Sequence, residues 1–137
     1  MIVVDTNIVV ALFIESARTP DAQRLFDNDP AWSTEPFTLV EFANVLATYH
    51  RAGRVTPARA ATYLSHAREF LQDHFLVVEP DSALKIALDF GVSAYDAHFL
   101  GVAWERGMKL TTEDARLRAA APRLTQSLDE ALKALIH

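Results

Sequence analysis

The hydrophobic positions of this chain fall into short runs separated by longer stretches with helical spacing. The short runs are rich in residues that favour strands, and we predict strands at Ile2–Val4, Ala31–Ser33, Phe75–Val78 and Met108–Thr111, with a fifth candidate near Arg123–Thr125. The longer stretches place apolar residues three and four positions apart, as in a helix that buries one face. Strands are therefore expected to alternate with helices.

Glycine and proline mark the ends of the predicted helices. Gly53, Gly91 and Gly107 each follow a helical stretch, at the position where a helix end favours left-handed backbone. Pro57 and Pro80 each stand where another helix can begin. We predict helices over Pro36–His50, Pro57–Leu71, Ser82–Phe90 and Val92–Arg106, and a terminal helix in the segment SLDEALKALIH.

This alternation is typical of an α/β domain with a mostly parallel sheet. No repeat, linker or low-complexity segment interrupts the chain, so residues 1–137 are expected to form one domain. In such sheets, ligands bind outside the carboxyl ends of the strands, where the following helices begin. Residues just after a strand, or in a helix's first turn, should therefore gather at one edge of the sheet.

Four acidic residues occupy such positions. Asp5 follows the first strand, Glu41 lies in TLVEFANVL, Asp96 in SAYDAHFL and Asp114 in LTTEDARL. Helix capping could explain each one alone: Thr38-x-x-Glu41, Ser93-x-x-Asp96 and Thr111-x-x-Asp114 have capping-box spacing, and Asp5 could cap a helix that starts at Thr6.

Two observations favour a shared chemical role for these acids. Asp96 lies on the same helical face as the apolar residues Phe99, Leu100 and Ala103, so its carboxylate should point inward. All four acids also map to one edge of the sheet, where like charges repel each other unless they are protonated or bridged by a cation. An all-oxygen cluster suits Mg²⁺ or Mn²⁺. We expect His98 to be structural or solvent-facing, because residues two apart on a helix do not face each other.

The composition narrows the class of protein further. Half of the 137 residues are hydrophobic, with four glycines and six prolines, as in a compact globular protein. Cysteine is absent, which disfavours a zinc site and fits a reducing compartment. No leader or membrane-spanning segment is visible, so we expect a cytoplasmic protein.

The net charge of −5 gives the chain no general attraction for nucleic acid. Neither a phosphate-binding G-x-x-x-x-G-K-[ST] loop nor a G-x-S-x-G nucleophile motif occurs.

The ordered set of motifs resembles the PIN-domain ribonucleases, and most closely the VapC-type toxins of toxin–antitoxin pairs. Asp5-Thr6-Asn7, LVEFANVL, SAYDAHFLGVA and LTTEDARL carry the resemblance, which runs from the first residues to about Leu117. It implies a three-layer α/β/α sandwich around a mostly parallel sheet of four to five strands. It also implies a metal-dependent endoribonuclease that hydrolyses RNA phosphodiester bonds.

The resemblance also implies roles for individual residues. Asp5, Glu41, Asp96 and Asp114 match the family's catalytic, metal-binding acids, with Mg²⁺ or Mn²⁺ as cofactor, while Asn7, Thr112 and Ser93 would support them. The two predicted helices around Gly53 would form a hairpin whose turn carries Arg51 and Arg54. These arginines, with Arg59 and Arg68, could contact RNA phosphates. The implied partners are a cognate antitoxin and a second copy of the chain in a homodimer, with no membrane contact.

Two alternatives stay open from the sequence. One is a non-catalytic protein that uses the same fold to bind RNA or a partner, because a fold alone does not fix a function. The other is a phosphohydrolase of the haloacid-dehalogenase type, which also places an aspartate after its first strand. That class requires a second acid where this chain has Asn7, and a lysine partner for which only Lys85, Lys109 and Lys133 are available.

Overall fold

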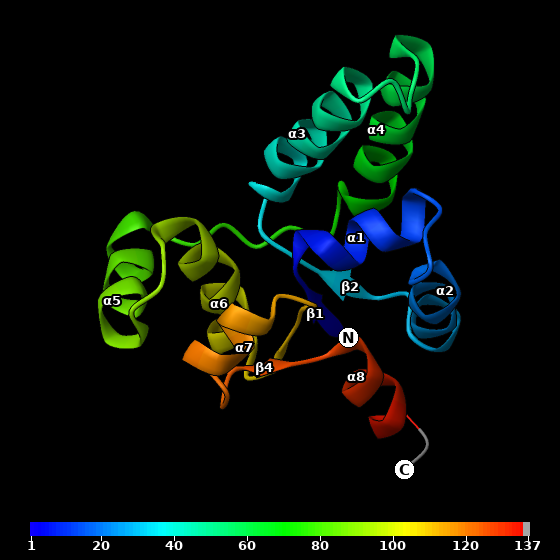
Figure 1. Ribbon diagram of the computed structural model, residues 1–137. Helices are drawn as coiled ribbons and strands as arrows, with labels where there is room; N and C mark the ends of the chain where they lie inside the picture. The colour runs from blue at the N-terminus through cyan, green and yellow to red at the C-terminus, as the bar shows by residue number, and fades with distance from the viewer. Residues whose placement is uncertain (136–137) are drawn as a thin grey trace.

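The computed structural model describes residues 1–135, in which a four-stranded sheet is covered by helices (Figure 1). The strands are β1 (Ile2–Val4), β2 (Trp32–Ser33), β3 (Leu110–Thr111) and β4 (Thr125–Gln126). The helices are α1 (Thr6–Phe13), α2 (Thr19–Asn28), α3 (Thr38–Arg51), α4 (Pro57–Leu71), α5 (Pro80–Phe90), α6 (Ala94–Arg106), α7 (Ala115–Ala120) and α8 (Leu128–Ala134).

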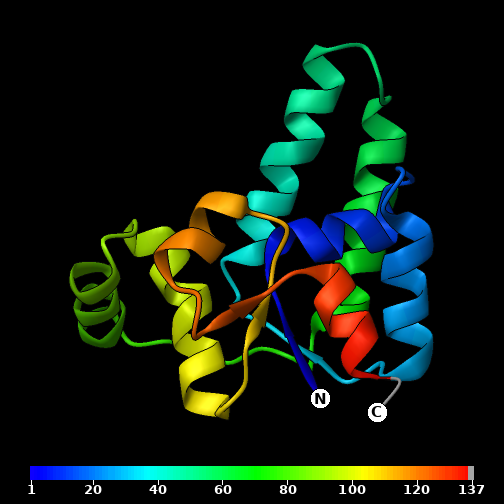
Figure 2. The same ribbon diagram turned by 60° about the horizontal axis from the view of Figure 1, so that its bottom comes forward.

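The sheet has the strand order β2-β1-β3-β4, and every pair of neighbours is parallel. Its central strand β1 separates two hydrophobic cores because successive side chains of a strand point to opposite faces. Ile2 and Val4 pack with α1, α2, α3, α4 and α8, whereas Val3 packs with α5, α6 and α7. Figures 1 and 2 show these two groups of helices on either side of the sheet. The predicted α/β/α sandwich with a parallel sheet is confirmed.

Four of the five predicted strand regions contribute a strand, and the prediction of a strand at Phe75–Val78 is wrong. The fifth candidate forms β4, whereas Phe75 makes only an isolated parallel bridge with Thr34. The segment then leaves the sheet edge, because Val78 packs against Gly101 of α6. A Cβ at that glycine would lie 2.7 Å from Val78. A run of strand-forming residues therefore crosses from the sheet to a helix without extending the ladder.

The helices begin and end close to the prolines and glycines that were predicted to mark their ends. Pro57 and Pro80 are the first residues of α4 and α5, while Gly91 and Gly107 end α5 and α6 with φ of 68° and 65°. Helices α2 and α7 are not among the predicted helices, whereas α1 begins at Thr6, where Asp5 was considered as a cap. The terminal helix forms as α8, and the last part of its predicted segment, residues 136–137, lies outside the described residues.

Helices α3 and α4 form a hairpin that projects from the rest of the molecule (Figures 1 and 2). Gly53 lies in its turn with φ of 73°, a left-handed conformation that favours glycine. The base of the hairpin packs beside α1, so the first turn of α3 lies near the carboxyl end of β1. Among the described residues, no helix is long and apolar enough to cross a membrane.

Candidate functional site

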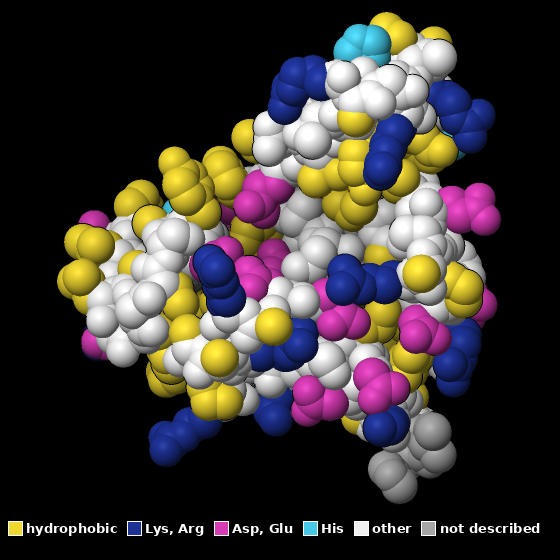
Figure 3. Space-filling view, viewed as in Figure 1, with side chains coloured by type: hydrophobic (Ala, Val, Ile, Leu, Met, Phe, Trp, Pro, Cys, Tyr) yellow, Lys and Arg dark blue, Asp and Glu magenta, His cyan; other side chains and the backbone are white. Residues whose placement is uncertain are grey.

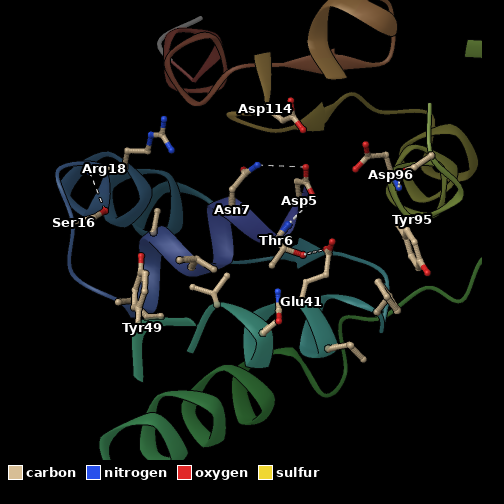
Figure 4. Close-up of a pocket in the computed structure, with 18 residues that line it drawn as sticks. Asp5, Thr6, Asn7, Ser16, Arg18, Glu41, Tyr49, Tyr95, Asp96 and Asp114 are labelled. Carbon is tan, nitrogen blue, oxygen red and sulfur yellow. Dashed lines mark hydrogen bonds between the residues drawn. The ribbon is translucent and has the colours of Figure 1, made fainter. Parts of the chain in front are cut away.

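A pocket of about 840 Å³ lies at the carboxyl ends of the central strands. Its lining includes all four predicted acids, Asp5, Glu41, Asp96 and Asp114, together with Asn7 and Ser93. Figure 4 shows Glu41, Asp96 and Asp114 arranged around Asp5, each carried by a different element. In the space-filling view, acidic side chains gather in a hollow at the foot of the α3–α4 hairpin (Figure 3). The structure therefore brings the four acids that the sequence singled out into one pocket at this edge of the sheet.

Asp5 is the most buried of these acids, with 7% of its surface exposed. Its Oδ1 accepts the N–H of Thr6 at 2.8 Å and caps α1, while its Oδ2 accepts the hydroxyl of Thr112 at 2.8 Å. Burial raises the pKa of the Asp5 carboxyl to about 6. The two hydrogen bonds oppose this rise, and the negative charges of Glu41 and Asp96 add to it. Capping a helix and lining the pocket are thus compatible roles.

Asn7 and Thr112 join the loop after β1 to the loop after β3. The amide of Asn7 donates to the hydroxyl oxygen of Thr112 at 3.1 Å, and its carbonyl oxygen accepts the N–H of Glu113 at 3.1 Å. The Thr112 hydroxyl oxygen also accepts the N–H of Asp114 at 3.1 Å. Since the same hydroxyl donates to Asp5, this network fixes the direction of the Asp5 carboxylate.

Glu41 is held by a threonine pair that the sequence did not reveal. The Thr6 hydroxyl donates to Glu41 Oε1 at 2.6 Å and lies 2.8 Å from the Thr38 hydroxyl oxygen. Because Thr6 has one hydroxyl proton, Thr38 must be the donor to Thr6. The capping box predicted for Thr38 and Glu41 does not form: Phe37 precedes α3 without a side-chain cap. Burial raises the pKa of Glu41, opposed by the Thr6 bond and reinforced by the charges of Asp96 and Glu35.

Asp96 and Asp114 complete the pocket from the first turn of α6 and the start of α7. The Ser93 hydroxyl oxygen accepts the N–H of Asp96 at 3.1 Å and caps α6. Burial raises the pKa of Asp96, and the charge of Asp114 adds to the rise. Asp114 Oδ1 accepts the N–H groups of Arg116 and Leu117 and caps α7. As predicted, Phe99, Leu100 and Ala103 on the Asp96 face of α6 are buried.

The donor set of the pocket suits a hard divalent cation. Its four acidic side chains offer carboxylate oxygens, which such ions prefer. The pKa is raised for Asp5, Glu41 and Asp96, and a bound cation would lower it again. Within residues 1–135, no group of three or more acids or histidines is close enough together to hold a metal ion by itself. Mg²⁺ does not require three protein ligands, since it keeps several waters and is usually held by one or two carboxylates.

The family assignment rests on the length of the match as well as on this pocket. The model of the PIN domain family matches residues 2–122, which include all four acids. The chain belongs to the PIN domain family.

Two curated relatives and one solved structure resemble this PIN domain, all from Pyrobaculum aerophilum. Ribonuclease VapC3 is 30% identical over 126 residues, covering 90% of this chain and 96% of the relative. Exonuclease VapC9 is 33% identical over 84 residues, covering 60% of this chain and 61% of the relative. The crystal structure of PAE2754 matches with a TM-score of 0.73 at 25% identity, covering 98% of this chain and 93% of that chain.

The four arginines predicted to contact RNA lie on the α3–α4 hairpin and not in the pocket. Arg51, Arg54, Arg59 and Arg68 are all exposed, and none of them lines the pocket of the PIN domain. Arg59 also lies over the ring of Tyr63, 5.5 Å from its centroid. The basic residue that does line the pocket is Arg18, in the turn between α1 and α2 (Figure 4). Its isolated position in the sequence gave no signal.

A second buried acid, Glu35, does not line the pocket of the PIN domain but contacts Phe37, which does. It is 5% exposed, and its Oε2 accepts the N–H of Phe37 at 2.8 Å. Its Oε1 lies 3.9 Å from Nδ1 of His98, a buried nitrogen with no hydrogen-bond partner among the described residues. His98, expected to be structural or solvent-facing, is therefore half-buried against Glu35. Glu35 itself was not singled out in the sequence, because it matches none of the recognised motifs.

Proposed function

We propose that this PIN-domain protein is a divalent-metal-dependent endoribonuclease and the toxin of a toxin–antitoxin pair. The observation that carries the proposal is the pocket in which Asp5, Glu41, Asp96 and Asp114 meet at the carboxyl ends of the strands. The name of one relative, Ribonuclease VapC3, supports hydrolysis of RNA phosphodiester bonds, and that of the other, Exonuclease VapC9, supports a nuclease activity. The acids lie in an open hollow of the surface (Figure 3), which favours cutting within a strand.

In this proposal, Asp5 and Asp96 are the principal ligands of Mg²⁺ or Mn²⁺. The bound ion would polarise the scissile phosphate and lower the pKa of a water molecule. Glu41 and Asp114 would help to hold the ion, and either carboxylate could accept a proton from the water that attacks phosphorus.

The surrounding polar side chains keep these carboxylates in place. Thr112 and Asn7 orient Asp5, the Thr6–Thr38 pair orients Glu41, and Ser93 holds the first turn of α6 that carries Asp96. Partners of metal ligands have large effects on such sites, since removing one typically costs about 10–100-fold in metal affinity or activity. The described contacts thus support a site in which the ion meets oriented oxygens.

The partners are proposed from the resemblance to VapC-type toxins. A cognate antitoxin would inhibit the enzyme, residues 1–137 would act as one nuclease domain in the cytoplasm, and two copies would form a homodimer. We expect a small DNA-binding protein encoded directly upstream to co-purify with this chain and to suppress its RNA cleavage. If the upstream product neither binds the chain nor lowers the cleavage rate, the toxin assignment is wrong.

The nuclease proposal is tested with purified protein and a circular RNA, which only an endonuclease can open. Cleavage should require Mg²⁺ or Mn²⁺, and Asp5→Asn and Asp96→Asn should each lower the rate by more than the ~10–100-fold typical of an indirect partner of the metal. Asp89→Asn is the matched control, because this exposed acid on α5 pairs within residues 1–135 with Lys85 alone, at 3.0 Å. Loss of an exposed pair of this kind has little effect.

Three outcomes would each contradict a part of this proposal. If either aspartate substitution leaves the rate unchanged, the assignment of the metal ligands is wrong. If the wild-type protein cleaves no RNA and binds no divalent ion by calorimetry, the non-catalytic alternative is favoured. Cleavage of linear but not circular RNA would instead identify an exonuclease.

A further inference from the structure

An aromatic pair stands at the edge of the acidic pocket. Phe37 comes directly before α3, and Tyr95 is the second residue of α6. Their rings are stacked, with centroids 5.2 Å apart and an interplanar angle of 21°. Both residues line the same pocket as the acids, and Tyr95 precedes Asp96 in the chain (Figure 4).

The two rings differ in how they are supported. Phe37 packs against the core formed by β1, α5, α6 and α7, whereas the Tyr95 side chain is 62% exposed. Tyr95 therefore rests on an anchored ring with one face and presents the other face to solvent. An aliphatic side chain would cover Phe37 equally well. A planar ring at this place is instead suited to extend a stack.

We propose that the Phe37–Tyr95 pair is a platform on which one unpaired base of the RNA substrate stacks. This inference rests on the nuclease proposed above and adds a residue that positions its substrate. Proteins bind unpaired bases by stacking them on aromatic side chains, and such stacking tolerates any base. Because Tyr95 lines the same pocket as Asp96 and the other acids, a base on the platform would hold the neighbouring phosphate close to the carboxylates.

The charge pattern of the pocket fits this arrangement of base and phosphate. Four carboxylates repel a phosphate unless a cation lies between them, whereas a neutral base can rest on an uncharged ring nearby. A base within a duplex is already stacked and paired, so it could reach the platform only after the duplex opened. The platform thus selects single-stranded segments without reading their sequence.

The experiment compares loss of the ring with loss of the base. The cleaved bond of a single-stranded RNA oligonucleotide is mapped first, and RNAs with one abasic nucleotide on either side of that bond are then synthesised. For the intact RNA, Tyr95→Leu should raise KM about 5- to 150-fold, the range that corresponds to the stacking of one base. Tyr95→Phe should keep the low KM, because the ring remains.

The decisive result is the combination of the two changes. One abasic RNA should raise the KM of the wild-type protein as much as Tyr95→Leu does, and the variant should then show no further loss with that RNA. Arg18→Gln is a useful contrast, because Arg18 lines the pocket and carries a positive charge that can attract phosphate. Loss of that charge should weaken binding of intact and abasic RNA equally and in a salt-dependent way. Thermal melting of each variant establishes that it is folded.

Several results would overturn the platform. The platform is refuted if Tyr95→Leu has the same KM as the wild-type protein. It is also refuted if the abasic RNA raises the KM of Tyr95→Leu by the same factor as it raises the KM of the wild-type protein. Cleavage of a fully paired duplex as fast as the single strand would also contradict it. If the wild-type protein cleaves no RNA, the nuclease proposal fails separately, and fluorescence anisotropy of labelled single-stranded RNA then tests the platform. An equal affinity of wild type and Tyr95→Leu for that RNA would refute it.

Discussion

The two walls of the acidic pocket are built in different ways. On the wall formed by the loops after β1 and β3, Asp5 is 7% exposed and its carboxylate accepts hydrogen bonds from Thr6 and Thr112. On the α6 wall, Asp96 is half-buried, and the neighbouring Tyr95 is 62% exposed. One wall holds its acid in a network of fixed contacts, while the other presents side chains to solvent.

The difference separates two tasks that a nuclease site must perform. Holding a metal requires carboxylates in a fixed direction, which the network around Asp5 supplies. Meeting a substrate requires accessible side chains, which α6 supplies. The fixed wall carries a cost in stability, because ionised Asp5 is taken out of water beside other acids.

Asp5→Asn should abolish activity and stabilise the metal-free protein at neutral pH. A pKa raised from 3.8 to about 6 corresponds to roughly 3 kcal/mol against the ionised form. Since the native state binds the proton more tightly than the unfolded chain, this penalty appears as the pH rises from about 4 to 6 and is complete above it. Asparagine carries no charge and does not incur this penalty. The unfolding free energy of the Asp5→Asn variant should therefore exceed that of the wild-type protein at pH 7 but not at pH 4.

Divalent metal provides the control for this prediction. Mg²⁺ should raise the melting temperature of the wild type, because a ligand that binds only the native state stabilises it. The same ion should have little effect on Asp5→Asn. Protons and metal compete for the carboxylate, so the acid limb of the activity profile should move to lower pH as Mg²⁺ increases. A variant less stable than wild type at pH 7 would contradict the assigned cost of the fixed wall.

Thr112→Val should lower activity about 10–100-fold, as expected when a partner of a metal ligand is lost. Valine has the shape of threonine but cannot donate to Asp5 Oδ2. Thr125→Val is a matched control, because Thr125 is also buried and its hydroxyl donates to the carbonyl of Ala121, away from the pocket. Both variants should lose stability, but only Thr112→Val should lose activity. Equal activity in the two variants would show that the network does not orient Asp5.

The sequence was sufficient to predict that the acids of the fixed wall and of the α6 wall lie close together. Their positions follow from one rule, that helix starts meet strand ends at a single edge of a parallel sheet. Contacts that depend on side-chain geometry could not be predicted in this way. Thr6 and Thr38 are 32 residues apart, and nothing in either segment indicates that their hydroxyls meet.

Two other expectations show the same limit. The run Phe75–Val78 has strand character, but whether it continues the ladder depends on the space that Gly101 leaves for Val78. Arg51 and Arg54 were correctly expected beside the turn of a helical hairpin. Their separation from the pocket depends on the direction in which that hairpin projects (Figure 1), which no local pattern specifies.

Glu35→Gln should have the smallest effect on activity. It tests whether a charge outside the pocket influences the pKa of Glu41 inside it. Glutamine can still accept the N–H of Phe37, but it removes a negative charge that raises the pKa of Glu41. Glu41 should then stay ionised to lower pH, and the acid limb of the activity profile should move down by less than about one pH unit. Glu79→Gln, at an exposed acid before α5, is the control and should leave the profile unchanged. A shift in the opposite direction would mean that Glu35 acts on Glu41 mainly by holding Phe37 and the start of α3 in place, since loss of that support would outweigh the loss of charge.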